Sequence, residues 1–509
     1  MKVTYLLLAL LSGLLIALSL PGFNLSFLAW FALVPLFFSL RRKKPGKAFL
    51  LGLISGLFTA IIILHFFPPL IVRLGKSYLL GIMTLLTLSL YFALYTGVFS
   101  LLLAIFQKRL TTRRTGATNY FSLMILLPAS WVSLELLQTR LFPGLPWTFI
   151  FLGYSQWNHS TLIQIADITG IYGISFLIVL VNSALYLAIR KKWLPGPIAA
   201  AVLFLASFLY GQARIGEYDS ISKEDALKVA VLQGNIEALT KWDERKGNSI
   251  AERYLELNRR AARDGPDLVV WTETAIPWPL GEGDDLVEAC LAITAPSRAC
   301  HLVGNPFPVA GKPSRFYNAA FFILPDGEII DRYYKIKLLA FAEAAPAGPE
   351  STTPFKAHPA SASYIAGGEQ TPLSTPLGKF GLSICNENSY PDFIRTPVLQ
   401  GAEYLVNMTN DAWFADKNPL TWHYMLNIFR AVENRRETVV ASNVGISGFI
   451  DAAGRTKEKS DRLTAAVLVG EVHPGEELTF YTLRGDVFSY ACVLLIISAL
   501  ISSFFLKKK

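Results

Sequence analysis

The chain has 509 residues, of which 52% are hydrophobic, and its mean hydropathy of +0.40 is too high for an ordinary soluble protein of this length. Its net charge of +9 comes from basic residues that cluster in short segments between apolar runs, as in membrane proteins. The composition therefore excludes a soluble globular enzyme, and it predicts a membrane protein with no nucleic-acid partner.

Apolar runs dominate the chain before about residue 213 and return at its C-terminal end. A transmembrane helix needs about 20 mainly apolar residues. The first run resembles a secretory signal peptide, but another run follows at once and no Ala-x-Ala cleavage site appears, so we expect it to be a span. The sequence predicts eight spans, at residues 4–20, 25–40, 48–66, 78–106, 119–138, 165–189, 194–213 and 487–506.

Basic residues gather in alternate loops between these predicted spans. They are Arg41, Arg42, Lys43, Lys44 and Lys47; Lys108, Arg109, Arg113 and Arg114; Arg190, Lys191 and Lys192; and Lys507, Lys508 and Lys509. Loops rich in Lys and Arg stay on the cytoplasmic side of the membrane. If the N-terminus is inside and there are eight spans, every basic loop lies on that side. The polar segment between spans seven and eight then faces outward.

The chain thus divides into a transmembrane domain of seven helices at 1–215, a globular domain at 220–480 and a last transmembrane helix at 487–506. In the globular domain, short β-rich runs alternate with helical stretches, which predicts a layered α/β sandwich. Pro, Ala, Gly and Ser are frequent at 344–368, which predicts a long loop of the kind used as a lid. The predicted strands are 227–233, 267–271, 301–304, 319–324, 328–334, 379–384, 403–407, 439–442 and 448–451, and the helices are 249–263 and 423–436.

Three reactive side chains follow predicted strands of this globular domain: Glu273, Lys335 and Cys385. A thiolate is the reactive form of Cys, and a nearby ammonium group and a general base favour its formation. Glu273 would take the thiol proton and later that of an incoming amine, and Lys335 would stabilise a tetrahedral oxyanion. Together these residue types predict a thiol nucleophile that works by acyl transfer.

Several other polar residues are compatible with two interpretations. Cys290 and Cys300 are close enough in sequence to form a disulfide in an oxidising compartment, or they are two buried free thiols. Cys492 lies in the last predicted span, where we expect a small apolar role. Asp411 and Arg430 either support a site or form a structural ion pair. No Cys/His spacing suggests zinc and no Gly-rich loop suggests a nucleotide, so we expect neither a metal nor an organic cofactor.

The segments around these three residues resemble the catalytic motifs of the nitrilase (carbon–nitrogen hydrolase) superfamily. These are Trp-Thr-Glu at 271–273, Tyr-Lys-Ile-Lys-Leu-Leu-Ala-Phe-Ala-Glu at 334–343 and Ser-Ile-Cys-Asn-Glu at 383–387. The eight-span frame and further segments are similar to the apolipoprotein N-acyltransferase family. Those segments lie at 146–147, 153–156, 233–236, 241–242, 410–414 and 429–436. The resemblance extends over essentially the whole chain.

The resemblance implies an α+β membrane protein of the bacterial cytoplasmic (inner) membrane, with a nitrilase-like αββα sandwich on the periplasmic side. It implies transfer of an acyl chain from a phospholipid, typically phosphatidylethanolamine, to the N-terminal amine of S-diacylglyceryl-cysteine of an apolipoprotein. In this reaction, the last step of lipoprotein maturation, Cys385 carries the acyl chain as a thioester. Glu273 is the base and Lys335 is the oxyanion partner.

The resemblance also implies supporting residues. Glu343 and Glu387 would support the site, Trp242 would lie near the lipid entrance, and Asn386, Asn410 and Trp413 complete the set of expected site residues.

Four positions depart from the family pattern. Lys337, Ala340 and Ala342 stand where the family usually has His, Pro and Gly, and Asn386 stands where it commonly has Tyr. Because the three central residues are retained, we expect these departures to affect substrate preference and loop geometry rather than the reaction. Lys335 fits the motif register of the catalytic Lys better than Lys337.

Two alternative functions compete with acyl transfer. In a membrane-tethered amide hydrolase, water would resolve the thioester, but a tether needs only one span and seven precede the domain. A transporter with an outer regulatory domain would need charged residues along an intramembrane path. The apolar runs contain few acidic residues, of which Glu135 is the most evident, and Asp167 lies near a span end. The sequence therefore favours the acyltransferase.

Overall fold

The computed structural model describes residues 2–112, 117–141, 148–220, 225–280, 283–340, 343, 364–414 and 416–505. Its contacts divide the chain into a helical unit, Met1–Leu141, Thr148–Ile215 and Asp486–Lys509, and an α/β unit, Phe142–Trp147 and Gly216–Gly485. Some features predicted above lie outside the described residues. They are Arg113 and Arg114, the motif at 146–147, Ala342, the segment 344–363 of the predicted lid, and Lys507, Lys508 and Lys509.

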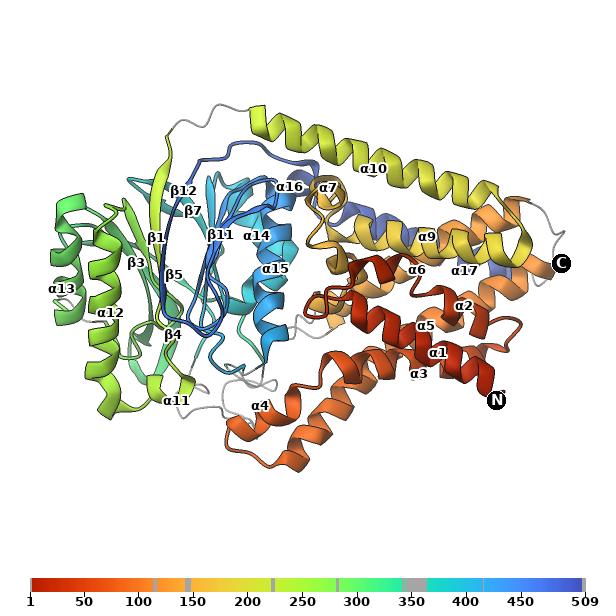
Figure 1. Ribbon diagram of the computed structural model, residues 1–509, viewed down its shortest axis with the longest axis horizontal. Helices are drawn as coiled ribbons and strands as arrows, with labels where there is room; N and C mark the ends of the chain where they lie inside the picture. The colour runs from red at the N-terminus through yellow and green to blue at the C-terminus, as the bar shows by residue number, and fades with distance from the viewer. Residues whose placement is uncertain are drawn as a thin grey trace. The chain divides into compact units, whose positions relative to one another are not determined.

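The helical unit contains no strand among its described residues (Figure 1). Five helices are long and apolar enough to cross a membrane: Pro45–Ile63, Tyr78–Lys108, Asn119–Leu141, Ile171–Lys191 and Pro195–Ser220. Three further apolar helical stretches are shorter. The elements are α1 (Val3–Ser19), η1 (Ser26–Trp30), α2 (Val34–Ser39), α3 (Pro45–Ile63), α4 (Phe67–Arg73), α5 (Tyr78–Thr112), α6 (Ala117–Leu141), η2 (Thr148–Ile150), η3 (Leu152–Gln156), α7 (Ser160–Ile163), α8 (Ala166–Thr169), α9 (Ile171–Lys191), α10 (Pro195–Ser220) and α17 (Val487–Phe505).

The apolar run at 25–40 is not the continuous helix that its composition predicts. It forms the 3₁₀ helix η1 and the short helix α2, which are separated by a turn. Asn182 of α9 accepts a hydrogen bond from the Leu33 amide at 2.8 Å and donates one to the Ala29 carbonyl at 2.8 Å. Irregular backbone at membrane depth is tolerated where the protein itself satisfies its polar groups. The Asn182 side chain, 149 residues after Leu33, therefore stabilises the interruption between η1 and α2.

The apolar run at 165–189 likewise becomes a continuous helix only from Ile171, where α9 begins. The preceding residue, Gly170, has φ 61 and ψ −170, a conformation that a residue with a Cβ rarely adopts. Gly170 thus separates the short helix α8 from α9.

The acidic residues of the helical unit have structural partners. Glu135 accepts a hydrogen bond from the Leu152 amide at 2.9 Å and is buried. Asp167 forms an ion pair with Arg214 at 3.0 Å and accepts a hydrogen bond from the Tyr210 hydroxyl at 2.8 Å. These carboxylates therefore stabilise the packing of the helical unit.

The α/β unit contains two six-stranded sheets, with strand orders β12-β1-β2-β3-β4-β5 and β11-β10-β9-β8-β7-β6. Within the first sheet β1, β2 and β3 are parallel, and within the second β7, β8 and β9 are parallel; the outer neighbours are antiparallel. The strands are β1 (Leu227–Gln233), β2 (Leu268–Val270), β3 (Cys300–Val309), β4 (Lys312–Ile323), β5 (Ile329–Tyr334), β6 (Leu373–Thr375), β7 (Gly378–Ile384), β8 (Tyr404–Thr409), β9 (Thr438–Ser442), β10 (Gly448–Ile450), β11 (Thr456–Lys459) and β12 (Ala466–Val472).

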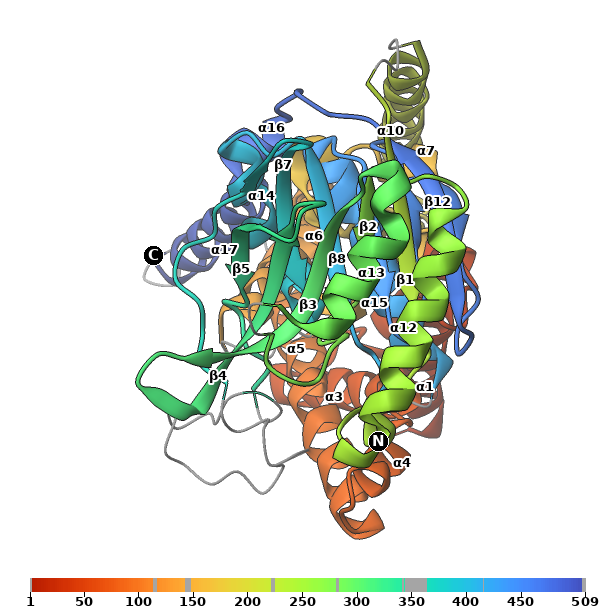
Figure 2. The ribbon, with the colours of Figure 1, turned by 90° about the vertical axis from the view of Figure 1, so that its left-hand side faces the viewer.

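Helices cover the outer face of each sheet and make four layers (Figures 1 and 2). Figure 2 shows α12 and α13 side by side in front of the first sheet, and α14 and α15 pack on the second. The helices of this unit are α11 (Ala238–Lys241), η4 (Glu244–Lys246), α12 (Gly247–Ala262), α13 (Asp285–Thr294), η5 (Ala295–Ser297), η7 (Cys385–Ser389), α14 (Pro391–Leu399), α15 (Lys417–Asn434) and α16 (Phe480–Arg484).

Alternation along the strands produces two apolar cores. In β1, Val229 and Val231 pack between the two sheets, whereas Ala230 and Leu232 pack against α12 and α13. Successive side chains of a strand point to opposite faces, so a strand that is apolar at every position is buried on both sides. The continuous apolar runs of the sequence therefore correspond to the central strands of this sandwich.

Every strand and helix that the sequence predicts in this domain is present; the strand at 227–233 has the predicted ends, and the other elements differ at one end or at both. The helix expected at 423–436 begins at Lys417, because the Asp416 side chain caps it by accepting a hydrogen bond from the Asn418 amide at 2.8 Å. The sequence interpretation missed the helices α11, α13, α14 and α16 and the strands β6, β11 and β12. Of these, β12 pairs antiparallel with β1, although the two lie at opposite ends of the domain sequence.

Of the two interpretations of Cys290 and Cys300, the structure supports two buried free thiols. Both are free and buried, so they form no disulfide with one another. The Cys290 Sγ accepts a hydrogen bond from Asn258 Nδ2 at 3.2 Å. Burial raises the pKa of Cys290 to about 12 and that of Cys300 to about 11, which makes both thiols poor nucleophiles.

Candidate active site

Three strand ends of the α/β unit carry the predicted reactive residues. Glu273 follows β2, Lys335 follows β5 directly, and Cys385 follows β7 directly. Lys335 Nζ lies 3.3 Å from Glu273 Oε1, and both charges act on the Cys385 thiol. The first two residues belong to one sheet and Cys385 to the other, so the facing sheets bring the three together.

Lys335 is enclosed by two carboxylates and is 1% exposed. Its Nζ lies 3.3 Å from Glu273 Oε1 and 2.8 Å from Glu343 Oε2. Burial disfavours the ammonium form, but Glu343 and then Glu273 outweigh burial and raise the pKa of Lys335 well above its usual value. Lys335 is therefore a permanent cation at the site. Lys337, by contrast, lies over the rings of Tyr390 and Phe393 at 5.8 and 5.7 Å.

Glu273 is oriented by donors at both carboxylate oxygens. Oε1 accepts a hydrogen bond from Asn318 Nδ2 at 2.7 Å, and Oε2 accepts one from the Asn410 amide at 2.8 Å. The Lys241 ammonium group donates to the Glu273 carbonyl at 3.3 Å and to the Asn410 side chain at 3.2 Å. Burial lowers the pKa of Lys241 to about 7. Every neighbour named here donates, so the carboxylate is fixed in place as an acceptor.

Cys385 is the first residue of η7 and lies in a strained turn directly after β7. Its φ is 55, in the left-handed region that a residue with a Cβ rarely adopts, and Thr274 and Asp411 share this feature with φ 44 and 55. Strained backbone of this kind clusters at functional sites. Burial and then the charge of Glu273 raise the pKa of Cys385 well above its usual value, and Lys335 opposes them. The resting thiol therefore needs a base before it can attack.

Glu387 connects the segment after β5 to the segment after β7. Oε1 accepts hydrogen bonds from the Ile336 and Lys337 amides at 2.7 and 2.9 Å. Oε2 accepts them from the Ile384 amide at 2.7 Å and the Tyr333 hydroxyl at 2.8 Å. The neighbouring Asn386 adds a bond from Nδ2 to the Lys337 carbonyl at 3.1 Å. These bonds fix Lys335 relative to Cys385.

Replacement of Glu387 by Ala should destabilise the α/β unit. It would leave the Ile336, Lys337 and Ile384 amides without their acceptor, each at a cost of roughly 1–3 kcal/mol, whereas the Tyr333 hydroxyl keeps a hydrogen bond to Gln370. We expect the free energy of unfolding to fall by about 3 kcal/mol or more, which lowers the apparent Tm by roughly 6–12 °C. Thermal unfolding of the purified protein measures this. Glu387→Gln keeps one acceptor oxygen and should lose less; equal Tm values for all three proteins would contradict the connecting role.

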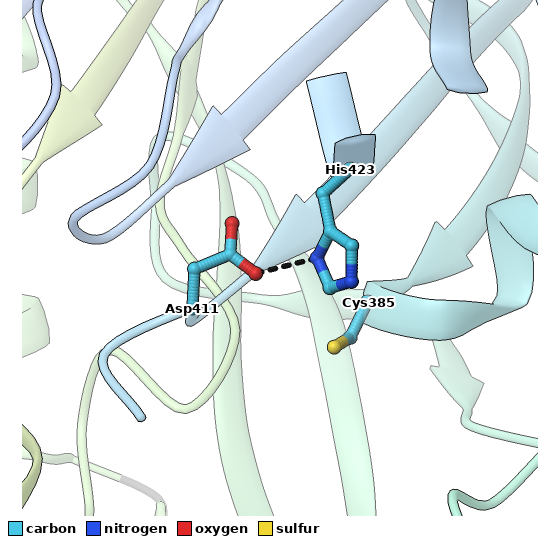
Figure 3. A group of neighbouring side chains, drawn as sticks. All are labelled: Cys385, Asp411 and His423. Carbon is cyan, nitrogen blue, oxygen red and sulfur yellow. Dashed lines mark ion pairs between the residues drawn. The ribbon is translucent and has the colours of Figure 1, made fainter. Parts of the chain in front are cut away.

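Asp411 and His423 form an ion pair next to Cys385, with Nδ1 and Oδ1 2.5 Å apart (Figure 3). Burial opposes both charges, but each partner outweighs it, so the pKa of Asp411 is lowered and that of His423 is raised. Arg430, which the sequence grouped with Asp411, instead forms an ion pair with Glu433 at 2.9 Å. Asp411 therefore belongs to the site, and the Arg430–Glu433 pair stabilises α15.

Asn410, Trp413 and Trp242 are the remaining predicted residues of the site. Asn410 contacts Glu273 directly, as described above. Trp413 packs in a small apolar cluster with Ala238, Leu420 and Val444. Trp242 is half-buried at the end of α11, next to Lys241.

The sequence did not identify three residues that contact the site. Asn318 lies on β4, His423 on α15, and Lys241 was noted only as part of a motif. Asn318 directly precedes the apolar segment 319–323 of β4, and its polarity at that position was the available signal. Nothing local distinguishes His423 from a surface histidine.

Two family models match the chain. The model of the apolipoprotein N-acyltransferase N-terminal domain matches residues 12–184, and the carbon–nitrogen hydrolase model matches residues 228–477. Together they cover both units of the structure.

Curated relatives match nearly the full length. An apolipoprotein N-acyltransferase from Geobacter metallireducens is 36% identical over 96% of this chain and 93% of its own length. One from Methylococcus capsulatus is 28% identical over 94% of this chain and 92% of its own length. A solved structure of Saccharomyces cerevisiae Nit3, from the nitrilase superfamily, matches 50% of this chain and 92% of its own length at 19% identity, with a TM-score of 0.38.

Proposed function

Because this chain belongs to the apolipoprotein N-acyltransferase family, we propose that Cys385 is the residue that carries the acyl chain during transfer. The enzyme is an acyltransferase of lipoprotein maturation, with lipid and lipoprotein substrates. The observation that supports these catalytic roles is the position of Lys335. Its ammonium group contacts Glu273, and its charge lowers the pKa of the Cys385 thiol.

The first half-reaction transfers the acyl chain to the enzyme. Glu273 takes the Cys385 proton, and Sγ attacks the ester carbonyl of a phospholipid, of which phosphatidylethanolamine is the expected donor. Lys335 stabilises the resulting oxyanion. The carbon–oxygen bond then breaks, and the lysophospholipid alkoxide takes the proton back from Glu273. A thioester on Cys385 remains.

The second half-reaction releases the chain to the acceptor. The N-terminal amine of S-diacylglyceryl-cysteine of an apolipoprotein attacks the thioester carbonyl and gives a proton to Glu273. The carbon–sulfur bond breaks, and the leaving thiolate recovers that proton. One base therefore serves twice, as a ping-pong cycle requires.

The supporting roles follow from contacts around these three residues. Glu343 maintains the charge of Lys335, and Glu387 with Asn386 fixes the backbone between Lys335 and Cys385. Asn410 orients Glu273 through its amide. For Trp242 and Trp413 we propose contact with the lipid chain, because aromatic side chains half-buried beside a site suit an apolar substrate.

The experiment that tests this function is intact mass spectrometry of the purified protein. After incubation with phosphatidylethanolamine, we expect a mass gain of one acyl chain, which a diacylglyceryl peptide then removes as an N-acylated product. A membrane-tethered hydrolase would lose the chain to water at the same rate without peptide. Absence of any acyl adduct would contradict the function.

We further propose that eight helices cross the bacterial inner membrane. In this arrangement 1–215 and 487–506 form the membrane domain, and 220–480 is a catalytic domain on the periplasmic side. The support is the bias of Lys and Arg toward alternate loops. The three shorter apolar helices then complete the set of spans.

Topology can be read from reporter fusions. A reporter inserted at 41–47 should be active only as a cytoplasmic fusion, because that loop is the most basic. One inserted in the exposed turn at 325–327, between β4 and β5, should be active only outside. Paired alkaline phosphatase and fluorescent-protein fusions measure both positions. An external signal from the 41–47 fusion would overturn the proposed orientation.

A further inference from the structure

Cys385, Asp411 and His423 bring together three different metal-binding groups (Figure 3). One thiol sulfur, one carboxylate oxygen and one imidazole nitrogen lie within 4.8 Å of one another. They come from the end of β7, the residues after β8 and the helix α15. The transfer steps described above use neither Asp411 nor His423, so their convergence on the thiol needs a separate explanation.

The donor set has the chemistry of a zinc site. Zn²⁺ binds Cys thiolate, His nitrogen and Asp oxygen, with three protein ligands and one open position in reactive sites. Bonds of about 2.0–2.3 Å at tetrahedral angles place donor atoms roughly 3.3–3.6 Å apart. Small side-chain rotations would bring the three groups to these separations.

Zinc would take the place of the proton between His423 Nδ1 and Asp411 Oδ1, which lie 2.5 Å apart as an ion pair. Asp411 itself is held in place, because Oδ1 accepts a hydrogen bond from the Thr409 hydroxyl and Oδ2 accepts one from the Ser442 hydroxyl, each at 2.9 Å. Outer partners of this kind orient metal ligands.

We propose that Cys385, Asp411 and His423 form a binding site for Zn²⁺, and that bound zinc blocks acyl transfer. On binding, the Cys385 thiol releases its proton to solvent and its sulfur bonds to the metal, so the nucleophile is no longer available. Binding depends only on the three donors. Inhibition rests, in addition, on the proposed role of Cys385.

The binding test uses the purified full chain in detergent after treatment with EDTA. Titration with zinc chloride, followed by calorimetry, should give one ion per chain. Cobalt chloride should produce a thiolate-to-metal charge-transfer absorption that is absent from Cys385→Ala. His423→Gln and Asp411→Asn should each weaken zinc binding by at least about tenfold. The control His473→Gln removes a histidine outside this cluster and should bind as the unmodified protein does.

The inhibition test distinguishes zinc binding at this site from the role of Cys385 as the nucleophile. Zinc should stop thioester formation and protect Cys385 from a small alkylating reagent, and EDTA should reverse both effects. In His423→Gln the zinc concentration needed for protection should rise by the same factor as the dissociation constant. No stoichiometric binding, or binding unchanged in both His423→Gln and Asp411→Asn, would overturn the site. Binding with the cobalt signal but without inhibition would instead overturn the role of Cys385 as nucleophile.

Discussion

Cys385→Ala should abolish the acyl-enzyme and reduce transfer by at least about 10³-fold, because no other group at the site can form the thioester. The substitution removes one sulfur from a half-buried position, so the protein should remain folded. Intact mass spectrometry after incubation with phosphatidylethanolamine measures the adduct directly. The unmodified protein should gain one acyl chain, and the variant should gain none.

The other two cysteines of the α/β unit are natural controls for this experiment. Cys290 and Cys300 are buried, and burial raises the pKa of each thiol. Cys290→Ala and Cys300→Ala should therefore still form the thioester. A stable acyl adduct on Cys385→Ala, or its loss from both control variants, would show that the nucleophile is another residue.

Glu273→Gln should impair both half-reactions, each by roughly 10²–10⁴-fold, since a positioned general base typically contributes that much. Lys335, Asn318 and the Asn410 amide all donate hydrogen bonds to Glu273. The NH₂ group of Gln must therefore face at least one donor, and it cannot accept the thiol proton. We expect little thioester, and any that forms should persist when the diacylglyceryl peptide is added.

A matched variant separates proton transfer from loss of charge beside Lys335. Glu343 also contacts Lys335 and Asn318, but the mechanism gives it no proton to carry. Glu343→Gln should therefore slow the reaction less than Glu273→Gln does. Single-turnover measurements, with phospholipid first and peptide second, resolve the two steps. Rapid formation and discharge of the thioester by Glu273→Gln would exclude it as the base and make Glu343 or Glu387 the next candidate.

The local sequence was sufficient to predict the strands that precede three site residues and the long apolar helices. The places of Glu273, Lys335 and Cys385 after strands were predictable because each of these strands is a short segment of the sequence. The five long apolar helices were predictable for the same reason, since length and composition alone decide whether a helix can cross a membrane. Spacing along the chain, however, did not predict that Cys385, Asp411 and His423 lie close together, because they come from separate elements.

Only the tertiary structure decided which polar groups meet. Asn182 interrupts the run at 25–40 through hydrogen bonds to backbone far from it in the sequence. Lys335 rather than Lys337 lies between two carboxylates, because the backbone after β5 is fixed by Glu387 from the other sheet. His423 reaches Asp411 only because α15 packs on the second sheet. Hydrophobic periodicity indicates which face of a helix or strand is buried. A polar contact depends on how two such elements are placed relative to one another. The sequence of a single segment does not determine that relative placement.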